Sequence, residues 1–266
     1  MATFNGLKFV PEVMPFYNGR LYHCDYSSDK IYELDPDTLL PINTVSSPST
    51  TPSGVGGTAT RLYHCNTGTG NLYELDPDTL LPINTVNTPS TDPYGVGGTA
   101  TRLYHCDAGS DSLYELDLDT LLPINTVNSP GTGPYGVGGT ATRLYHCDAN
   151  SSNLYELDPD TLLPINTVNS PGTYSYGVGG TATRLYHCDI ISDNLYELDV
   201  DTLLPINTVS SPSTIPTGVG GTATRLYHCD KSSDSLYELD PDTLLPINTV
   251  SSPSTYPYGV GGTKEN

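Results

Sequence analysis

The chain lacks tryptophan and has few of the residues that usually fill a core or build a helix. Among 266 residues there are three phenylalanines and two methionines, so a large core must rest on leucine, valine, isoleucine and twenty tyrosines. The helix-favouring alanine, lysine, glutamine and arginine are scarce. Glycine, with 26 copies, and proline, with 23, are abundant. This composition favours many short strands joined by turns.

Basic residues are a second shortage. Ten lysines and arginines stand against thirty aspartates and glutamates, which gives a formal net charge of -20 at pH 7. Nucleic acids and anionic membranes bind clustered cationic side chains, so we expect neither as a partner. The ordinary explanation for such a charge is a soluble surface that resists aggregation. The more specific alternative is that the negative surface binds cations or a mineral.

Long apolar segments are absent as well. Residues Met1 to Gly6 contain no basic region followed by an apolar run, so no secretory signal is visible. No uninterrupted apolar stretch is long enough to span a bilayer. The sequence as it stands predicts a soluble protein, although a processed form could have lost its signal.

A 41-residue unit is repeated along almost the whole chain. The string Arg-Leu-Tyr-His-Cys begins at Arg20, Arg61, Arg102, Arg143, Arg184 and Arg225. A period close to forty residues with strand-like content is typical of a propeller in which each unit forms one blade. The sequence therefore predicts an all-β, six-bladed β-propeller with four antiparallel strands per blade.

The first unit shows the expected order of strands. Residues 20–24 and 31–35 read as a hairpin, followed by the turn Asp35-Pro36-Asp37-Thr38. Residues 41–45 begin with proline and so form the edge strand on the outer rim. Residues 54–58 are rich in glycine and suit the crowded centre. Antiparallel pairing within the hairpin predicts three cross-strand neighbours, the last an ion pair: Leu21 with Leu34, His23 with Tyr32 and Arg20 with Asp35.

These residues carry a family resemblance. Gly54-Val55, then Arg61-Leu62-Tyr63, a turn, and Leu72-Tyr73-Glu74-Leu75-Asp76 resemble NHL and YVTN-type propeller repeats over nearly the whole chain. Leu62-Tyr63-His64-Cys65 stands where the YVTN tetrapeptide is usual. The resemblance implies a propeller and a range of roles that includes scaffolds, binding modules and lactonases.

The chain ends offer more inner-strand candidates than there are blades. Asn18-Gly19 is a hairpin signal, so Val13 to Tyr17 is one candidate in a segment, 1–19, that joins the propeller of residues 20–266 in one domain. Gly259 to Thr263 is another, and we favour closure of the ring by this C-terminal copy. In the alternative this copy is spare and mediates self-association through Gly259, Val260, Gly261, Gly262 and Thr263.

Differences among the copies gather in two windows, which in the first copy are residues 25–31 and 46–53. The strand order places both windows on one face of the disc. Loops vary more than strands in any protein, which is the ordinary explanation. Drift alone, however, would have loosened both faces alike, so we predict that the variable face binds a ligand. Its predicted anchors are tyrosines, which combine rigid area with a hydroxyl: Tyr26, Tyr94, Tyr135, Tyr174, Tyr176, Tyr256 and Tyr258.

The repeated His23-Cys24 doublet invites a metal or catalytic interpretation. Adjacent strand residues point to opposite faces, so one doublet cannot chelate one ion. Equivalent cysteines of neighbouring blades are too far apart for a disulfide. We expect buried free thiols, which favour a reducing compartment and hence the cytoplasm, although localisation stays open. The Gly54–Thr58 segment lacks the lysine of a phosphate loop, and the acidic turns lack calcium-loop spacing, so we predict no metal and no cofactor.

Hydrolysis needs unlike residues in different roles around one substrate, whereas six nearly identical blades offer six equivalent environments. We therefore predict a non-enzymatic binding or scaffold module with a protein or glycan on its variable face. One alternative is a structural subunit that assembles into oligomers or filaments. Another is an engineered propeller without a natural ligand, since near-identity of the copies suits recent duplication or design. The last is a lactonase-like hydrolase with a metal at the axis.

Overall fold

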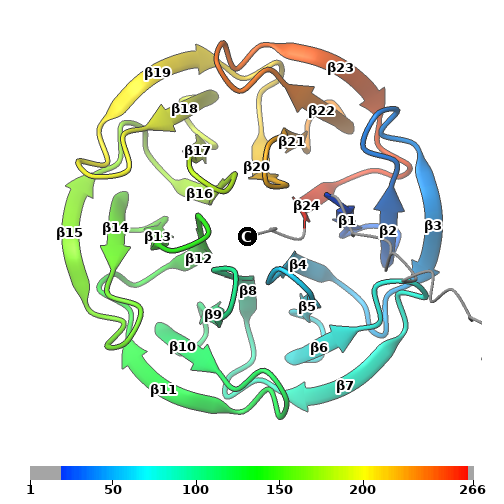
Figure 1. The fold of residues 1–266 in the computed structure, drawn as a ribbon, viewed down its shortest axis with the longest axis vertical. Helices are drawn as coiled ribbons and strands as arrows, with labels where there is room; N and C mark the ends of the chain where they lie inside the picture. Colours follow the sequence, from blue (N-terminus) through cyan, green and yellow to red (C-terminus); the bar gives the residue numbers. More distant parts are fainter. Residues whose placement is uncertain (1–18, 263–266) are drawn as a thin grey trace, which may run out of the picture.

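The computed structural model describes residues 19–262 of the chain. Its 24 β-strands form six four-stranded antiparallel sheets around a central axis (Figure 1). The six-bladed propeller predicted from the 41-residue repeat is therefore confirmed. In this part of the chain no helix has the length and apolar character needed to cross a membrane.

Each blade contributes one strand to each of four concentric rings. The innermost strands are β4 (Pro52–Gly57), β8 (Pro93–Gly98), β12 (Pro134–Gly139), β16 (Ser175–Gly180), β20 (Pro216–Gly221) and β24 (Pro257–Gly262). The second strands are β1 (Leu21–Asp25), β5 (Leu62–Asn66), β9 (Leu103–Asp107), β13 (Leu144–Asp148), β17 (Leu185–Asp189) and β21 (Leu226–Asp230). The third strands are β2 (Lys30–Leu34), β6 (Asn71–Leu75), β10 (Ser112–Leu116), β14 (Asn153–Leu157), β18 (Asn194–Leu198) and β22 (Ser235–Leu239). The rim strands are β3 (Pro41–Ser46), β7 (Pro82–Asn87), β11 (Pro123–Asn128), β15 (Pro164–Asn169), β19 (Pro205–Ser210) and β23 (Pro246–Ser251).

The ring is closed by its first and last strands. β24 lies antiparallel to β1, with Leu21 opposite Gly262, and the first blade has the order β24-β1-β2-β3. Closure by the C-terminal copy is therefore confirmed. The alternative that this copy is spare is wrong, because Gly259 to Gly262 already form the inner strand of the first blade. Self-association through these residues stays a prediction. Thr263 and the competing candidate, Val13 to Tyr17, lie outside the described residues.

The predicted order and register within a blade are correct. In the first blade Leu21 lies opposite Leu34, and His23 lies opposite Tyr32. The strand that begins at Pro41 lies on the rim, where a residue without an N–H leaves no ladder position empty. The glycine-rich strands are innermost, as their lack of side-chain bulk requires.

The predicted ion pair between Arg20 and Asp35 is wrong. Nε of Arg20 lies 2.6 Å from Oε1 of Glu33 instead. The Asp35 carboxylate accepts hydrogen bonds from the backbone N–H groups of Asp37 and Thr38, at 3.0 and 2.8 Å. Because these bonds keep the carboxylate of Asp35 in the turn that follows the strand, Arg20 forms its ion pair with Glu33, which lies diagonally across the two strands.

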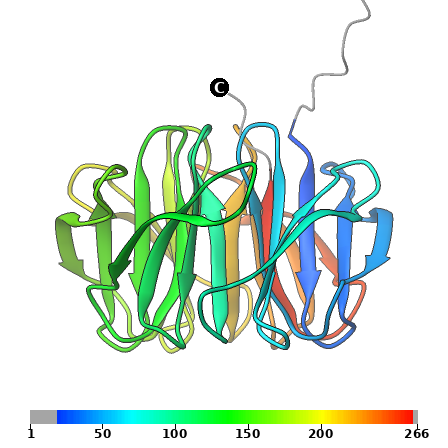
Figure 2. The ribbon, with the colours of Figure 1, turned by 90° about the horizontal axis from the view of Figure 1, so that it is seen from below.

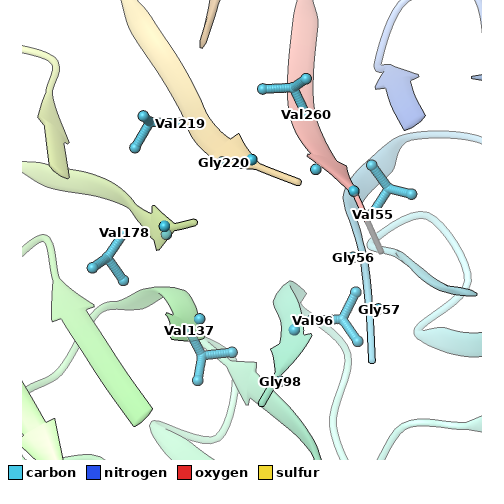
Figure 3. Close-up of a pocket in the computed structure, with 17 residues that line it drawn as sticks. Val55, Gly56, Gly57, Val96, Gly98, Val137, Val178, Val219, Gly220 and Val260 are labelled. Carbon is cyan, nitrogen blue, oxygen red and sulfur yellow. The ribbon is translucent and has the colours of Figure 1, made fainter. Parts of the chain in front are cut away.

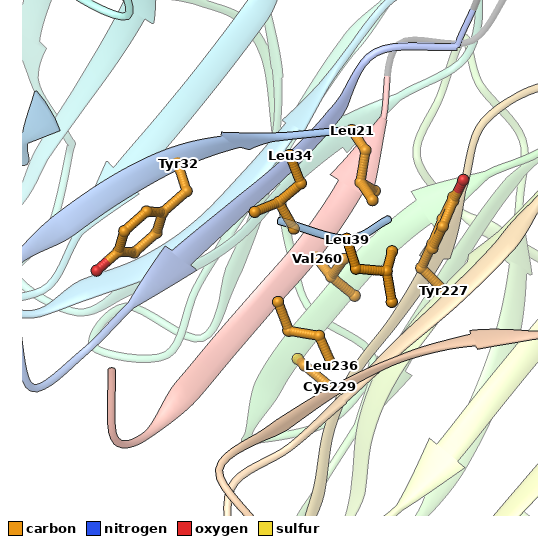
Figure 4. Close-up of a cluster of buried hydrophobic side chains, with 8 residues drawn as sticks. All are labelled: Leu21, Tyr32, Leu34, Leu39, Tyr227, Cys229, Leu236 and Val260. Carbon is orange, nitrogen blue, oxygen red and sulfur yellow. The ribbon is translucent and has the colours of Figure 1, made fainter. Parts of the chain in front are cut away.

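The hydrophobic core lies between blades. Six equivalent clusters fill the spaces between neighbouring sheets. Strand residues alternate between the two faces of a sheet, so each blade contributes to two clusters and cannot bury its apolar side chains alone. The cluster between the last and first blades contains Leu21, Tyr32, Leu34, Leu39 and Val260 on one side and Tyr227, Cys229 and Leu236 on the other (Figure 4).

Leu39 shows how strongly this packing dominates local preferences. Its φ is +57°, a left-handed conformation that costs a non-glycine residue about 1–2 kcal/mol. Its side chain is buried in the cluster between the last and first blades, and burial of a leucine contributes about 1.5–3 kcal/mol. Burial therefore outweighs the strain, and the five equivalent leucines adopt the same conformation.

Glycine is required where inner strands meet around the axis. A Cβ atom on Gly56 would lie 2.5 Å from the carbonyl oxygen of Val96 in the next blade. Between the first and second blades the space is wider, since a Cβ atom on Gly261 would lie 3.1 Å from the carbonyl oxygen of Val55. The Gly-Val-Gly-Gly segment is thus a packing motif that sets the distance between blades.

A ring of ion pairs joins the blades on one face of the disc. We call this the constant face; it carries the turns equivalent to residues 35–40 and 58–60. Each repeat arginine binds the glutamate of its own blade and an aspartate of the next blade. The pairs between blades are Arg20–Asp78, Arg61–Asp119, Arg102–Asp160, Arg143–Asp201, Arg184–Asp242 and Arg225–Asp37.

The rim strands reinforce this ring. Nδ2 of Asn43 donates to the carbonyl oxygen of Asp78 in the next blade at 3.1 Å, and the other five rim strands repeat the bond. The aspartates are well exposed, so each ion pair contributes little alone. A change in one copy would nevertheless break contacts to its neighbour. This constraint favours the nearly uniform sequence of the constant face, in which Pro36 alone varies, to Leu118 and Val200. Variation on the other face is therefore not by itself evidence of binding.

In five of the six blades a buried histidine connects the second strand to the loop that enters the blade. Nδ1 of His64 lies 2.8 Å from the carbonyl oxygen of Gly54, and Nε2 lies 3.1 Å from Oγ of Ser47. The carbonyl accepts, so Nδ1 carries the proton and Nε2 accepts from the serine. Burial lowers the pKa of His64 to about 4, which keeps the ring neutral. The arrangement recurs at His23, His146, His187 and His228.

The glycine spacing predicts unequal effects of the same substitution in two blades. Gly56→Ala should lower the free energy of unfolding by about 1–3 kcal/mol, because its methyl group meets backbone that must move. Gly261→Ala is the matched control, and it should cost clearly less because its carbonyl neighbour is farther away. Urea unfolding followed by circular dichroism measures both. Equal losses would contradict the assigned spacing.

Candidate functional site

The two variable windows lie together on the face opposite the constant face. The N–H of Ser47 donates to the carbonyl of Asp29 at 2.7 Å, and the N–H of Thr67 donates to that of Thr51 at 3.2 Å. We call this the variable face; it carries the loops equivalent to residues 26–29 and 47–51. β1 begins and β24 ends at the same edge of the disc, on the constant face (Figure 2). The variable face is therefore free of the ends of the described chain.

A β-bulge occurs where each inner strand leaves the variable face. The register between β8 and β9 shifts at this point, so that Pro93 and Gly95 are paired and Tyr94 is not. Bulges re-aim side chains next to functional sites. The bulged residues of the six blades line one cavity of about 100 Å³ at the axis: Tyr258, Ser53, Tyr94, Tyr135, Tyr176 and Thr217, in blade order.

The tyrosines at these positions contact one another around the axis. The ring centroids of Tyr94 and Tyr135 are 4.3 Å apart, those of Tyr135 and Tyr176 are 5.0 Å apart, and those of Tyr176 and Tyr258 are 5.6 Å apart. The hydroxyl groups of Tyr176 and Tyr258 are hydrogen-bonded to each other. Four of the seven predicted tyrosines are thus brought together from four different blades.

Loop tyrosines extend this group outward. The ring of Tyr26 lies 5.6 Å from that of Tyr258, and the ring of Tyr174 lies 6.3 Å from that of Tyr135. We call these six residues the tyrosine cluster: Tyr26, Tyr94, Tyr135, Tyr174, Tyr176 and Tyr258. The seventh predicted residue, Tyr256, is 44% exposed and stands apart, with Nζ of Lys231 at 4.3 Å from its ring centroid.

Ser53 and Thr217 also line the cavity, although the sequence reasoning singled out only aromatic anchors. Oγ of Ser53 donates to the carbonyl oxygen of Pro93 at 2.6 Å, and Oγ1 of Thr217 donates to that of Pro257 at 2.8 Å. Both hydroxyls are therefore engaged by the next blade, and the aromatic ring is interrupted at these two blades. Their alignment with Tyr94 in the repeat was the signal that could have identified them.

The cavity is neutral, but the loops around it are acidic. Burial raises the pKa of Tyr94, Tyr135 and Tyr258, so their hydroxyls stay protonated. No charged side chain lines the cavity among the described residues. The two variable windows of the six copies together contain two lysines and ten aspartates: Asp25, Asp29, Asp92, Asp107, Asp111, Asp148, Asp189, Asp193, Asp230 and Asp234.

The other end of the axis is smaller and apolar. Val55, Gly56, Gly57 and their equivalents line a cavity of about 70 Å³ there (Figure 3). It offers methyl groups and peptide backbone, without side chains that could bind or transfer a proton. It is a consequence of the glycine packing rather than a second site.

The cysteine of each doublet is also structural. Cys65 is buried, and burial raises the pKa of its thiol to about 12. A Cβ atom on Gly54 would lie 2.9 Å from its sulfur, so the thiol occupies the space that this glycine leaves. Residues 19–262 contain no group of three or more His, Cys, Asp or Glu side chains that could hold a metal. The absence of a metal and a cofactor from the protein stays a prediction.

Comparisons with known proteins identify the fold. No protein-family model and no curated protein matches the chain. A chain of the crystal structure of a nidogen/laminin complex is 15% identical, with a TM-score of 0.77 over 92% of this chain and 98% of that chain. A protein of unknown function from Bacteroides caccae is 10% identical, with a TM-score of 0.69 over 92% and 98% of the two chains. A streptogramin B lyase is 14% identical, with a TM-score of 0.66 over 91% and 83%. At these identities the similarity shows a shared β-propeller fold, while membership of the NHL group stays a prediction.

Proposed function

We propose that the chain is a non-enzymatic binding module that recognises a protein partner through its variable face. The observation that carries the proposal is the set of bulges that brings tyrosines from different blades together at the cavity of about 100 Å³. We call this cavity the mouth; its tyrosines are Tyr94, Tyr135, Tyr176 and Tyr258. Tyrosine is enriched at interface hot spots because it combines a large apolar ring with a hydroxyl.

The size of the cavity favours a partner that covers the face. About 100 Å³ holds only a small group, so most of a ligand has to contact the surrounding loops. Those loops differ from blade to blade and expose Tyr26, Tyr174 and Tyr256 by 38–44%. A macromolecule that places one group in the mouth would use both features. One structure with a similar fold belongs to a complex between two proteins, nidogen and laminin.

The residues best suited to acid–base chemistry are engaged elsewhere. His64 and Cys65 are buried and hold the second strand against its neighbours. The tyrosine hydroxyls are neutral, and no carboxylate lines the mouth beside them among the described residues. This arrangement supports a binding role over hydrolysis, which needs a nucleophile and a base in contact.

Replacement of mouth tyrosines should weaken partner binding while the blades stay folded. Thr217 occupies the same position in the sixth blade, so the double variant Tyr135→Thr, Tyr176→Thr introduces a residue that the fold already accepts. We expect at least about a tenfold loss of affinity, as is typical when interface tyrosines are removed. Quantitative affinity capture from an extract of the native source, followed by mass spectrometry, measures the loss.

The matched control for this experiment is Ile42→Thr on the rim. Ile42 is 61% exposed and lies away from the variable face, so its replacement should leave capture unchanged. If the rim variant loses the partner and the double tyrosine variant keeps it, the proposed face is wrong. A glycan array tests the other ligand class with the unchanged chain, the double tyrosine variant and the rim variant. If a glycan binds in a tyrosine-dependent way and no protein partner is captured, the ligand is a glycan and the proposed protein partner is wrong.

A further inference from the structure

We propose, on the basis of the function proposed above, that the tyrosine-lined mouth binds an alkylated ammonium group. The group is either a free quaternary amine or an alkylated side chain of the protein partner. Three properties of the mouth lead to this chemistry: its charge environment, the nature of its lining and its size.

The charge environment favours a cation. The variable windows contain ten aspartates and two lysines, so the loops around the mouth carry a net negative charge, although five of the aspartates are buried. Lys231 already lies over an aromatic ring of this face, with Nζ 4.3 Å from the centroid of Tyr256. An anionic or phosphorylated ligand would meet repulsion and find no arginine, because the arginines of the described residues bind aspartates on the constant face.

The lining selects among cations. The mouth offers aromatic rings, neutral hydroxyls and backbone, with no carboxylate in contact among the described residues. A metal ion or a simple ammonium is strongly hydrated and would lose that hydration without an ionic partner. An alkylated ammonium is weakly hydrated, and tyrosine rings attract it through their negative faces. Tyr94, Tyr135 and Tyr176 bring three such rings together on the lining of the cavity, against which the group would lie.

The size sets an upper limit on the group. One water needs about 10–15 Å³ of cavity volume. A cavity of about 100 Å³ therefore holds either several waters or one compact headgroup, but no extended ring system. Ser53 and Thr217 carry smaller side chains than the tyrosines at the equivalent positions, so we expect a chain attached to the headgroup to leave the mouth on their side. The geometry therefore fits a headgroup on a narrow stem.

The test compares choline with its uncharged carbon isostere, dimethylbutanol, which has nearly the same shape. Tyrosine ring resonances in NMR spectra of the whole chain report binding of either molecule. We expect choline to shift the resonances of Tyr94, Tyr135 and Tyr176 and to bind at least about tenfold more tightly than the isostere. Equal binding of the two would overturn the proposal.

Two variants separate the ring from its hydroxyl. Tyr135→Phe keeps the aromatic face and should retain choline binding within about threefold. Tyr135→Thr, which copies the residue at position 217, should reduce it at least about tenfold; a thermal melt confirms that it is folded. Loss in the phenylalanine variant, or retention in the threonine variant, would contradict binding through the ring.

The source of the group is decided in a further arm. A peptide with trimethyllysine, its unmodified copy and free choline are titrated in parallel. A preference for the modified peptide over choline assigns the group to a protein side chain, and the reverse assigns it to a free amine. If the captured partner depends on the mouth tyrosines but none of these probes binds, the proposed function stands and the ammonium is rejected.

A second inference comes from the loops that enter the inner strands, which adopt two arrangements. In one, the last loop residue has positive φ and its N–H donates to the preceding blade: Thr51 to Asp29, Tyr174 to Ser152 and Tyr256 to Asp234. In the other, the N–H donates to the next blade: Gly133 to Asp148 and Ile215 to Asp230.

Each arrangement leaves the other acceptor without a hydrogen-bond partner among the described residues. Where the amide turns to the preceding blade, Oδ2 of Asp25 and of Asp189 is buried and unbonded. Where it turns to the next blade, Oδ1 of Asp111 and of Asp193 is unbonded. At Tyr174, Tyr256, Gly133 and Ile215 one donor thus stands between two acceptors, and either choice leaves one oxygen unsatisfied. Thr51 differs, because the next blade carries Asn66 in place of the aspartate.

We infer that these loops are two-state elements whose amide exchanges between the two acceptors. The number of hydrogen bonds is equal in both states, so the backbone conformation of one residue decides between them. Tyr174 and Tyr256 are both in the first arrangement, and Ile215 is in the second. Backbone preference is not the whole cause, since Thr51 has positive φ although it is β-branched and Gly133 does not although it is glycine. Because Tyr174 and Tyr256 occupy the switching position, a ligand on the variable face that prefers one state would shift the population.

Substitution at the switching position tests this inference. Tyr256→Ile should move the amide from Asp234 to Asp25, and Ile215→Tyr should produce the opposite move, from Asp230 to Asp193, because both tyrosines at this position are in the first arrangement. Tyr256→Asn is the matched control, because asparagine tolerates positive φ and should leave the loop as it is. Crystal structures of the variants show the result. An amide that stays on Asp234 in the isoleucine variant would overturn the two-state assignment.

Discussion

Contact between neighbouring sheets is the constraint on which this molecule depends. No blade buries its apolar side chains alone, so Leu21 and Leu34 of one blade need Tyr227 and Leu236 of another. The close approach at the axis is possible because Gly56 and its equivalents carry no side chain. With the distance between blades fixed in this way, the ion pairs of the constant face and the cavity of the variable face both follow.

The two faces put the same repeat to different uses. On the constant face, Arg20, Asp78 and Asn43 bind from blade to blade, and a change in one unit affects the next. On the variable face, the bulged position accepts serine, threonine or tyrosine without a change of register. The fold is thus maintained by one face, while the other is free to carry aromatic groups at the axis.

Much of this arrangement could be predicted from the sequence. The repeat predicted the blades, Pro41 predicted the rim strand, and the hairpin predicted that Leu21 faces Leu34. The ion pair of Arg20 could not be predicted by opposite register alone, because Asp35 is taken by its own turn. Such competition between a turn and a strand depends on distances that a sequence does not contain.

The candidate site was predictable in part. The tyrosines were placed on the correct face, but their convergence depends on a one-residue bulge that no motif announces. The convergence of these tyrosines is tested most directly by photo-oxidative dityrosine cross-linking of the monomer, followed by mapping of the cross-linked peptides from the variable windows. Cross-linked peptides that join Tyr94 to Tyr135 and Tyr176 to Tyr258 are the expected result, because these rings are 4.3 and 5.6 Å apart. A monomer with no cross-link between these blades would contradict the shared mouth.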